Sequence, residues 1–122
     1  MLACNPKVSK PFNPILGETC EGSIAGIPIY MEQISHHPPI SAFLMKSDKF
    51  EISGLIDVIV DIGLNSANTK FPSHFKVKIY QNNTEYLVKL PEIELSGIMF
   101  GDRGLLLSGK GYVLEKNSGT YL

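Results

Sequence analysis

Apolar and polar residues alternate with a period of two along much of the chain. The alternation is clearest in HFKVKIY, residues 74–80, where every second side chain is apolar. The polar stretch QNNT, residues 81–84, favours a hairpin turn, and the alternation resumes over residues 85–90. The pattern predicts two antiparallel strands joined by a tight turn.

Further strands are predicted wherever β-favouring runs lie between Gly, Pro or Ser-Asp pairs. They cover residues 18–24, 27–34, 40–46, 50–60, 92–97 and 105–114. A hairpin is predicted at residues 22–26, a bend at Gly109 and Gly111, and one long loop at residues 64–73. Because no stretch shows a sustained 3.6-residue period with helix caps, the predicted fold class is an all-β antiparallel meander.

Two proline-rich motifs interrupt this pattern: Lys10-Pro11-Phe12-Asn13-Pro14 and His36-His37-Pro38-Pro39. A residue before proline is pushed out of the helical region, and proline itself fixes φ and donates no backbone hydrogen bond. We therefore predict a stiff corner at residues 36–39. Adjacent side chains on a regular strand point to opposite faces. For both imidazoles to serve one site, the backbone must turn at or just before the two prolines.

The chemistry of these motifs suits a phosphorylated ligand. Lys10 would supply a point charge, and His36 and His37 would act as imidazolium donors beside a phosphate dianion, which favours the cation. Taken singly, each motif also fits a simpler interpretation. A His-His pair is commonly a turn whose rings are satisfied by backbone or solvent, and a single lysine is commonly a solvated surface residue.

Together the motifs resemble a known family. EQISHHPP, residues 32–39, closely resembles the hallmark of the oxysterol-binding-protein-related lipid-transfer proteins, whose usual form has Val where Ile34 stands. KPFNPILGET, residues 10–19, resembles a second block of the same family, in the expected order and separation. Residues 52–55 and 94–101 resemble weaker family segments.

The resemblance implies a large, mostly antiparallel β-barrel that encloses one lipid. Members of the family extract phosphatidylinositol 4-phosphate, and many exchange it for sterol or phosphatidylserine. The head-group-binding positions it implies are Lys10, His36 and His37, with Asn13 as a further contact. Glu18 and Glu32 are interpreted as structural, Leu16-Gly17 as a tight turn, and four mid-strand residues as either core or acyl-chain contacts: Ile29, Met31, Phe43 and Met45.

The family's lid precedes the first block, and a basic set on a late helix follows the region covered by this chain. The resemblance thus implies that residues 1–122 are the central part of a ligand-binding domain, with the lid and the C-terminal helical part absent. We expect part of a large, incomplete lipid-binding β-barrel. Open sheet edges tend to pair with another chain, which predicts strand-exchanged self-association.

Composition limits the alternatives. The 122 residues are 43% hydrophobic and 19% charged, which fits one folded domain, and the net charge of −1 gives no field that favours nucleic acid. No apolar run approaches the ~20 residues of a membrane span, which favours a cytoplasmic protein, peripheral to membranes. The two cysteines, Cys4 and Cys20, lack metal-site spacing and are too few for a disulfide scaffold.

The leading hypothesis is non-enzymatic lipid binding and transfer, without metal or cofactor, through transient contact with a membrane surface. One alternative is a phosphoinositide-docking module that does not extract lipid. A remote alternative is a metal-dependent hydrolase that uses His36, His37 and His74 with an acid such as Glu32 or Asp102. No third ligand stands at a recognisable metal-site spacing.

Overall fold

The computed structural model describes residues 12–121, and this part of the chain is built from β-strands and turns. The strands are β1 (Thr19–Ile24), β2 (Ile27–Ser35), β3 (Ile40–Lys46), β4 (Phe50–Asp57), β5 (Ile59–Ile62), β6 (Ser66–Lys70), β7 (Phe75–Ile79), β8 (Thr84–Lys89), β9 (Glu92–Ser96), β10 (Gly104–Ser108) and β11 (Tyr112–Glu115). Residues 12–121 include no helix long and apolar enough to cross a bilayer.

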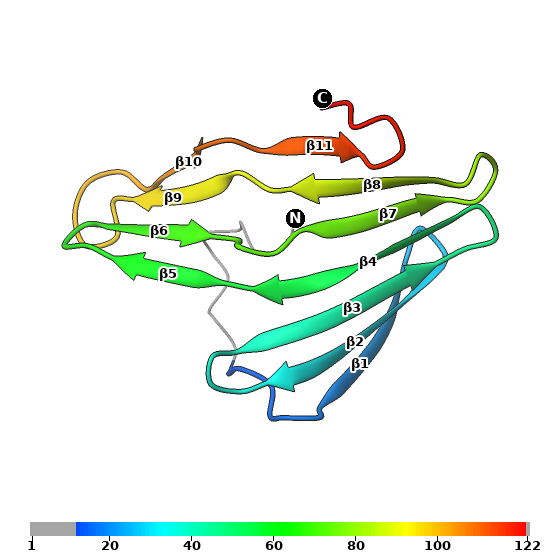
Figure 1. Ribbon diagram of the computed structural model, residues 1–122. Helices are drawn as coiled ribbons and strands as arrows, with labels where there is room; N and C mark the ends of the chain where they lie inside the picture. The colour runs from blue at the N-terminus through cyan, green and yellow to red at the C-terminus, as the bar shows by residue number, and fades with distance from the viewer. Residues whose placement is uncertain (1–11, 122) are drawn as a thin grey trace.

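The strands form two sheets with antiparallel pairing throughout. The larger has seven strands in the order β1-β2-β3-β4-β7-β8-β11, and the smaller has four in the order β10-β9-β6-β5. Figure 1 shows the two sheets end to end, as one long curved surface. The predicted all-β antiparallel fold is therefore confirmed.

The two sheets are made from the same long strands. Only Val58 separates β4 from β5, and short connections separate β6 from β7, β8 from β9 and β10 from β11. Three of these connections contain residues that fit a strand ladder poorly: Pro72, Pro91, and the pair Gly109 and Gly111. The interruptions are aligned across neighbouring strands, so the ladder breaks along one line.

Side chains replace part of the backbone pairing that is lost along this line. The Lys89 ammonium donates to the carbonyl oxygens of Phe71 and Pro72, the latter at 2.8 Å. The backbone N–H of Ser73 donates to Asp57 Oδ1 at 3.0 Å. Because unpaired backbone polar groups are costly where water is excluded, these contacts stabilise the junction between the two sheets.

Two predictions of strand boundaries were wrong, and a third was right. Residues 50–60 form two strands divided at Val58, and residues 64–73 include strand β6 where a loop was predicted. The β6 sequence SANTK has no apolar alternation, but β6 lies between β5 and β9 and pairs with both. The sequence of β6 does not predict a strand, and hydrogen bonding to its two neighbours makes it one. The bend predicted at Gly109 and Gly111 is confirmed by the division between β10 and β11.

One face of the larger sheet gathers the mid-strand apolar residues. Ile29 is opposite Met45 and Met31 is opposite Phe43, so all four share a face. The rings of Phe43 and Phe75 meet edge to face on this side, with centroids 5.2 Å apart. Yet no hydrophobic side chain within residues 12–121 is fully buried, because no second layer covers the sheet.

Candidate functional site

His36 and His37 lie in the turn between β2 and β3. Strand β2 ends at Ser35 and β3 begins at Ile40, so residues 36–39 make the whole connection, and its His37–Pro38 peptide bond is cis. The two imidazole centroids are 4.5 Å apart, with an interplanar angle of 64°. The backbone thus turns just before the prolines, as predicted, and the two rings are neighbours.

A β-bulge precedes the turn and changes the direction of the chain. Gln33 is opposite Ser41 and Ser35 is opposite Ile40, which leaves Ile34 as an extra residue in β2. Such a bulge bends its strand and increases the local twist. The bulge and the turn together free the histidines from the strict alternation that would separate adjacent side chains on a strand.

The first proline-rich motif packs against this turn. The N–H of Gly17 donates to the carbonyl oxygen of Gln33 at 2.8 Å, and the N–H of Gln33 donates to the carbonyl oxygen of Glu18 at 2.9 Å. His36 Nδ1 donates to the carbonyl oxygen of Pro14 at 2.9 Å. These three bonds bring the C-terminal half of residues 10–19 beside the EQISHHPP segment, more than a dozen residues further along the chain.

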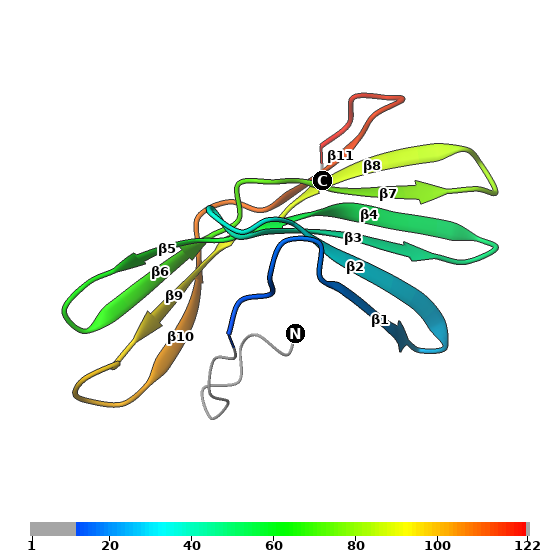
Figure 2. The same ribbon diagram turned by 90° about the horizontal axis from the view of Figure 1, so that it is seen from below.

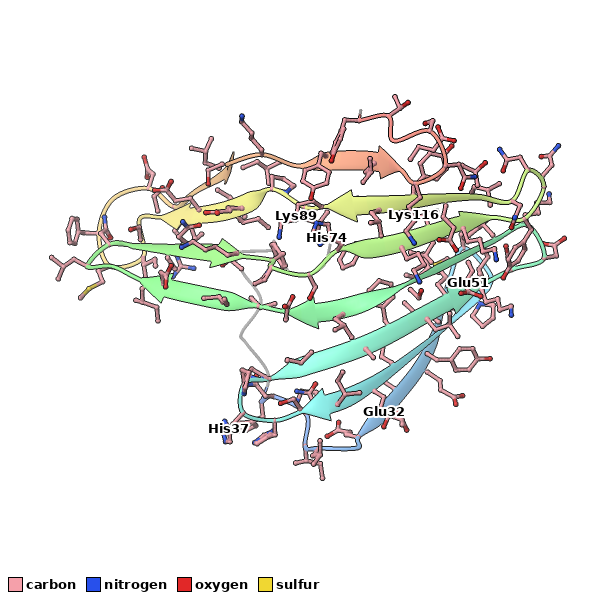
Figure 3. All side chains as sticks on the ribbon, viewed as in Figure 1. Glu32, His37, Glu51, His74, Lys89 and Lys116 are labelled. Carbon is pink, nitrogen blue, oxygen red and sulfur yellow. The ribbon has the colours of Figure 1, made fainter. Side chains whose placement is uncertain are left out.

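Local chemistry fixes the shape of the Pro14–Glu18 corner. Gly17 has a φ of 79°, a left-handed conformation that other residues adopt at a cost. The Glu18 carboxylate accepts a hydrogen bond from the N–H of Ile15 at 3.0 Å, while the N–H of Glu18 donates to the Ile15 carbonyl at 3.0 Å. The predicted tight turn at Leu16-Gly17 and the structural role predicted for Glu18 are both confirmed. Glu32 is exposed on β2 (Figure 3).

Gln33 supports the histidine turn, and sequence reasoning did not single it out. Its side chain is only 2% exposed. The amide nitrogen donates to the Ser35 carbonyl at 2.7 Å, and the amide oxygen accepts from the Ser41 hydroxyl. A buried amide needs such partners on both sides. The sequence feature that could have identified Gln33 is its position three residues before His36, near the predicted end of a strand.

The bond to Pro14 determines what His36 can offer a ligand. A carbonyl oxygen only accepts, so Nδ1 of His36 must carry a hydrogen. This leaves Nε2 to accept a hydrogen bond when the ring is neutral and to donate one when it is protonated. His36 is half-buried, whereas His37 is exposed at the outer part of the turn (Figure 3). The pair thus offers one oriented imidazole and one exposed imidazole.

The other two predicted site residues belong to the first motif. Asn13 is exposed and directly precedes Pro14, whose carbonyl binds His36. Lys10 lies outside the described residues. Among residues 12–121, neither histidine of the turn forms an ion pair with a carboxylate. The cationic form of the turn would therefore keep its charge for an anionic ligand.

The residues of the metal-hydrolase alternative are not gathered at one place. Within residues 12–121, no three His, Cys, Asp or Glu side chains are arranged to hold a metal ion. His74 lies beside β7, and its Nε2 is 2.7 Å from the hydroxyl oxygen of Tyr112 (Figure 3). The two imidazoles of the β2–β3 turn are neighbours, whereas His74 is paired with a tyrosine on another strand.

Comparison with known proteins gives one consistent result. The sequence model described as "Oxysterol-binding protein" matches residues 2–122. Oxysterol-binding protein homolog 2 of Saccharomyces cerevisiae is 33% identical over 121 residues, which cover 94% of this chain and 9% of that protein. The chain therefore spans about a tenth of the length of this relative.

Solved structures show the same similarity in three dimensions. The ORD domain of Osh1 in complex with cholesterol has a TM-score of 0.83 and 33% identity, over 94% of this chain and 29% of that one. The ORD domain of Osh3 from Saccharomyces cerevisiae, solved in complex with PI(4)P, has a TM-score of 0.80 and 24% identity over 88% of this chain and 29% of that one. The second likeness is one of fold alone.

Proposed function

Because the chain belongs to the oxysterol-binding protein family, we propose that it contributes the head-group-binding section of a non-enzymatic lipid-transfer domain. The observation that supports this most directly is the contact between the two motifs at the β2–β3 turn. Three hydrogen bonds join residues 14–18 to Gln33 and His36. If the two motifs were only separate turns, these hydrogen bonds between them would not be needed.

The proposed ligand of the turn is the phosphorylated inositol head group of phosphatidylinositol 4-phosphate. His36 and His37 would donate to phosphate oxygens, because hydrogen bonds from a cation to a phosphate are about twice as strong as neutral ones. Asn13 would contact a head-group hydroxyl, and Lys10 would add a full positive charge. Both residues belong to the motif that packs against the turn.

The apolar face of the larger sheet is the proposed contact for the lipid tails or for an exchanged lipid such as sterol or phosphatidylserine. Ile29, Met31, Phe43 and Met45 share this face, and none is fully buried. The Osh1 relative is described in complex with cholesterol, which favours sterol as one such ligand. Burial of a methylene group contributes about 0.8 kcal/mol, so an acyl chain would gain by leaving water for this surface.

We further propose that residues 1–122 are the central section of a larger ligand-binding domain, which acts at the cytoplasmic surfaces of membranes. The structural match includes 94% of this chain but only 29% of the Osh1 domain. The uncovered apolar face favours a second candidate function for the chain taken alone. It would bind phosphoinositide head groups on a membrane without extracting the lipid.

The decisive experiment measures extraction of phosphatidylinositol 4-phosphate from liposomes, alongside co-sedimentation with the same liposomes. The wild-type chain is compared with a Lys10→Ala/His36→Ala/His37→Ala variant and with His74→Ala, a matched loss of a histidine outside the turn. We expect the triple variant to lose about tenfold or more in affinity, since each charge-assisted hydrogen bond contributes about 1.5–3 kcal/mol. His74→Ala should bind like the wild type.

The outcomes separate the two functions. Extraction by the wild type and by His74→Ala, but not by the triple variant, supports lipid transfer. Co-sedimentation without extraction supports the docking module. Equal binding by wild type and triple variant would remove the histidine turn from the site.

A further inference from the structure

The turns at the two ends of the molecule differ in chemistry. At one end, the turns between β3 and β4, between β7 and β8 and after β11 are polar: residues 47–49, 80–83 and 116–119. The β1–β2 turn at this end adds one large exposed apolar residue, Ile24. At the other end, the β5–β6 and β9–β10 connections carry large apolar side chains. Figures 1 and 2 both show these connections at the end of the sheet towards which the β2–β3 turn also points.

We call this group of side chains the apolar tip and define it by five residues: Ile62, Leu64, Ile98, Met99 and Phe100. Their exposed fractions are 81%, 89%, 37%, 75% and 68%. A single exposed apolar residue needs no explanation, but several gathered at one place indicate an interaction surface. Two connections that are more than thirty residues apart in the sequence contribute to it.

Asn65 holds the two connections together through four hydrogen bonds. Its side-chain Oδ1 accepts from the N–H groups of Met99 at 2.9 Å and Phe100 at 3.1 Å. Its Nδ2 donates to the Phe100 carbonyl at 2.9 Å, and its own carbonyl accepts from the N–H of Ile98 at 3.3 Å. The N–H groups of Ile98, Met99 and Phe100 are therefore paired within the tip, which holds the β9–β10 connection against Asn65.

Gly97 adds a second constraint on the same connection. Its φ is 70°, and a Cβ atom at this position would collide with the carbonyl oxygen of Asp102. The β9–β10 connection folds back on itself at this point and projects its next three side chains, Ile98 to Phe100. Only glycine allows that close approach.

The shape and charge of the tip indicate what it contacts. Its two connections project from the end of the smaller sheet (Figure 2), and a projecting group suits a soft surface better than a complementary pocket. Backbone groups that are already hydrogen-bonded cost less to remove from water. Nearby charges balance, since Asp61 pairs with Lys70 at 2.8 Å and Asp102 is followed by Arg103. With a net charge of −1, attraction would come from apolar contact.

From these observations we infer that the apolar tip inserts into the interface of a phospholipid bilayer and so directs the His36–His37 turn towards the lipid head groups. This role rests on the proposed function, because it presupposes a lipid-transfer domain that contacts membranes. The five residues of the apolar tip, which contact the membrane in this proposal, lie outside the His36–His37 turn. Insertion should require no phosphoinositide and should depend little on salt, because charge screening does not weaken apolar burial.

The chain contains no tryptophan, which permits a single-tryptophan test. Phe100→Trp places the reporter in the tip, and Asn82→Trp places it in the polar β7–β8 turn as a matched control. Both are mixed with phosphatidylcholine vesicles that contain no phosphoinositide, with and without brominated acyl chains. We expect a blue shift and at least twofold quenching for Phe100→Trp, and neither for Asn82→Trp.

A second comparison measures partition into the same vesicles. Leu64→Ser/Phe100→Ser should lower the partition coefficient about tenfold or more, since each exchange removes several buried methylene equivalents. Ile24→Ser/Tyr30→Ser removes two exposed apolar side chains from β1 and β2 and should have little effect. Far-ultraviolet circular dichroism checks that each variant keeps its strands.

Three results would overturn the inference: equal quenching at both reporter positions, no quenching at either, or a blue shift that grows with protein concentration when no vesicles are present. The last would mean that a second copy of the chain covers the tip. Failure of the head-group site is distinguishable, because the His36→Ala/His37→Ala variant would still insert its tip into vesicles that lack phosphoinositide.

Discussion

At the scale of single residues, Gln33 determines the geometry of the histidine turn. Its buried amide bonds Ser35 and Ser41, and its backbone bonds Gly17 and Glu18. One residue thus ties β2, β3 and the first motif together. Loss of its side chain would leave the Ser35 carbonyl and the Ser41 hydroxyl without these partners.

We predict that Gln33→Leu lowers the free energy of unfolding by about 1–3 kcal/mol, the usual cost of leaving buried polar groups unpaired. It should also weaken head-group binding, because His36 follows the disturbed segment. Urea unfolding and liposome binding would measure the two effects. Glu32→Leu, an exposed neighbour on the same strand, is the control, and equal destabilisation by both variants would contradict the prediction.

At the scale of secondary-structure elements, Gly54 allows three strands to pack. A Cβ atom at this position would lie 2.8 Å from Phe75 and 3.2 Å from Phe43, the two rings that meet edge to face. We predict that Gly54→Val costs about 1–3 kcal/mol of stability, because overpacking forces these rings from their positions. Thermal unfolding measures the change. Ser53→Val, on the opposite face of β4, should cost less.

The edge strand β11 is attached to β8 partly by an ion pair. Lys116 Nζ is 3.0 Å from Glu85 Oε2, and hydrogen bonding to this ammonium holds the pKa of the Glu85 carboxyl below its ordinary value. A carboxyl with a lowered pKa stabilises the fold above its unfolded-state pKa, and this contribution is lost as pH falls through the folded-state value.

We therefore predict that Lys116→Met raises the pKa of the Glu85 carboxyl towards its ordinary value. The variant should be less stable than the wild type near neutral pH and equally stable in acid. Carboxyl chemical shifts during an NMR titration would report the pKa. Lys49→Met, in the β3–β4 turn, is the control, and an unchanged Glu85 titration in Lys116→Met would contradict the assignment.

At the scale of the whole molecule, the main feature is unused apolar surface. The accessible area is 8924 Å², whereas a compact protein of 13.4 kDa exposes roughly 6,500 Å². A single curved layer cannot bury its own faces. A second layer, a lipid or another chain would cover these faces.

Two consequences of this surface can be measured. Because little area is newly exposed on unfolding, the urea m-value should lie below the value typical of a compact domain of this length. On the proposal that sterol covers the apolar face and binds only the folded chain, the unfolding midpoint should rise with the logarithm of the sterol concentration above its Kd. An m-value typical of a compact domain would show that the face is already covered in solution.

The sequence by itself determined most of the strands and turns and the identity of the family. Period-two alternation located β7 and β8, because every second side chain of a strand points to the same face. Runs bounded by Gly, Pro or Ser-Asp located most of the others. The prolines and Gly17 located the corners, because their backbone limits are local. The two motifs, read in order, identified the family and the candidate site residues.

Only the tertiary structure decided the existence of β6, the break at Val58 and the contacts between residues that are distant in sequence. Strand β6 exists because β5 and β9 pair with it, and the break at Val58 follows prolines and glycines in neighbouring strands. The support of His36 by Pro14 and Gln33, and the joining of two connections by Asn65, depend on residues that are distant in sequence. Their contacts arise from strand register, which is a property of the whole sheet.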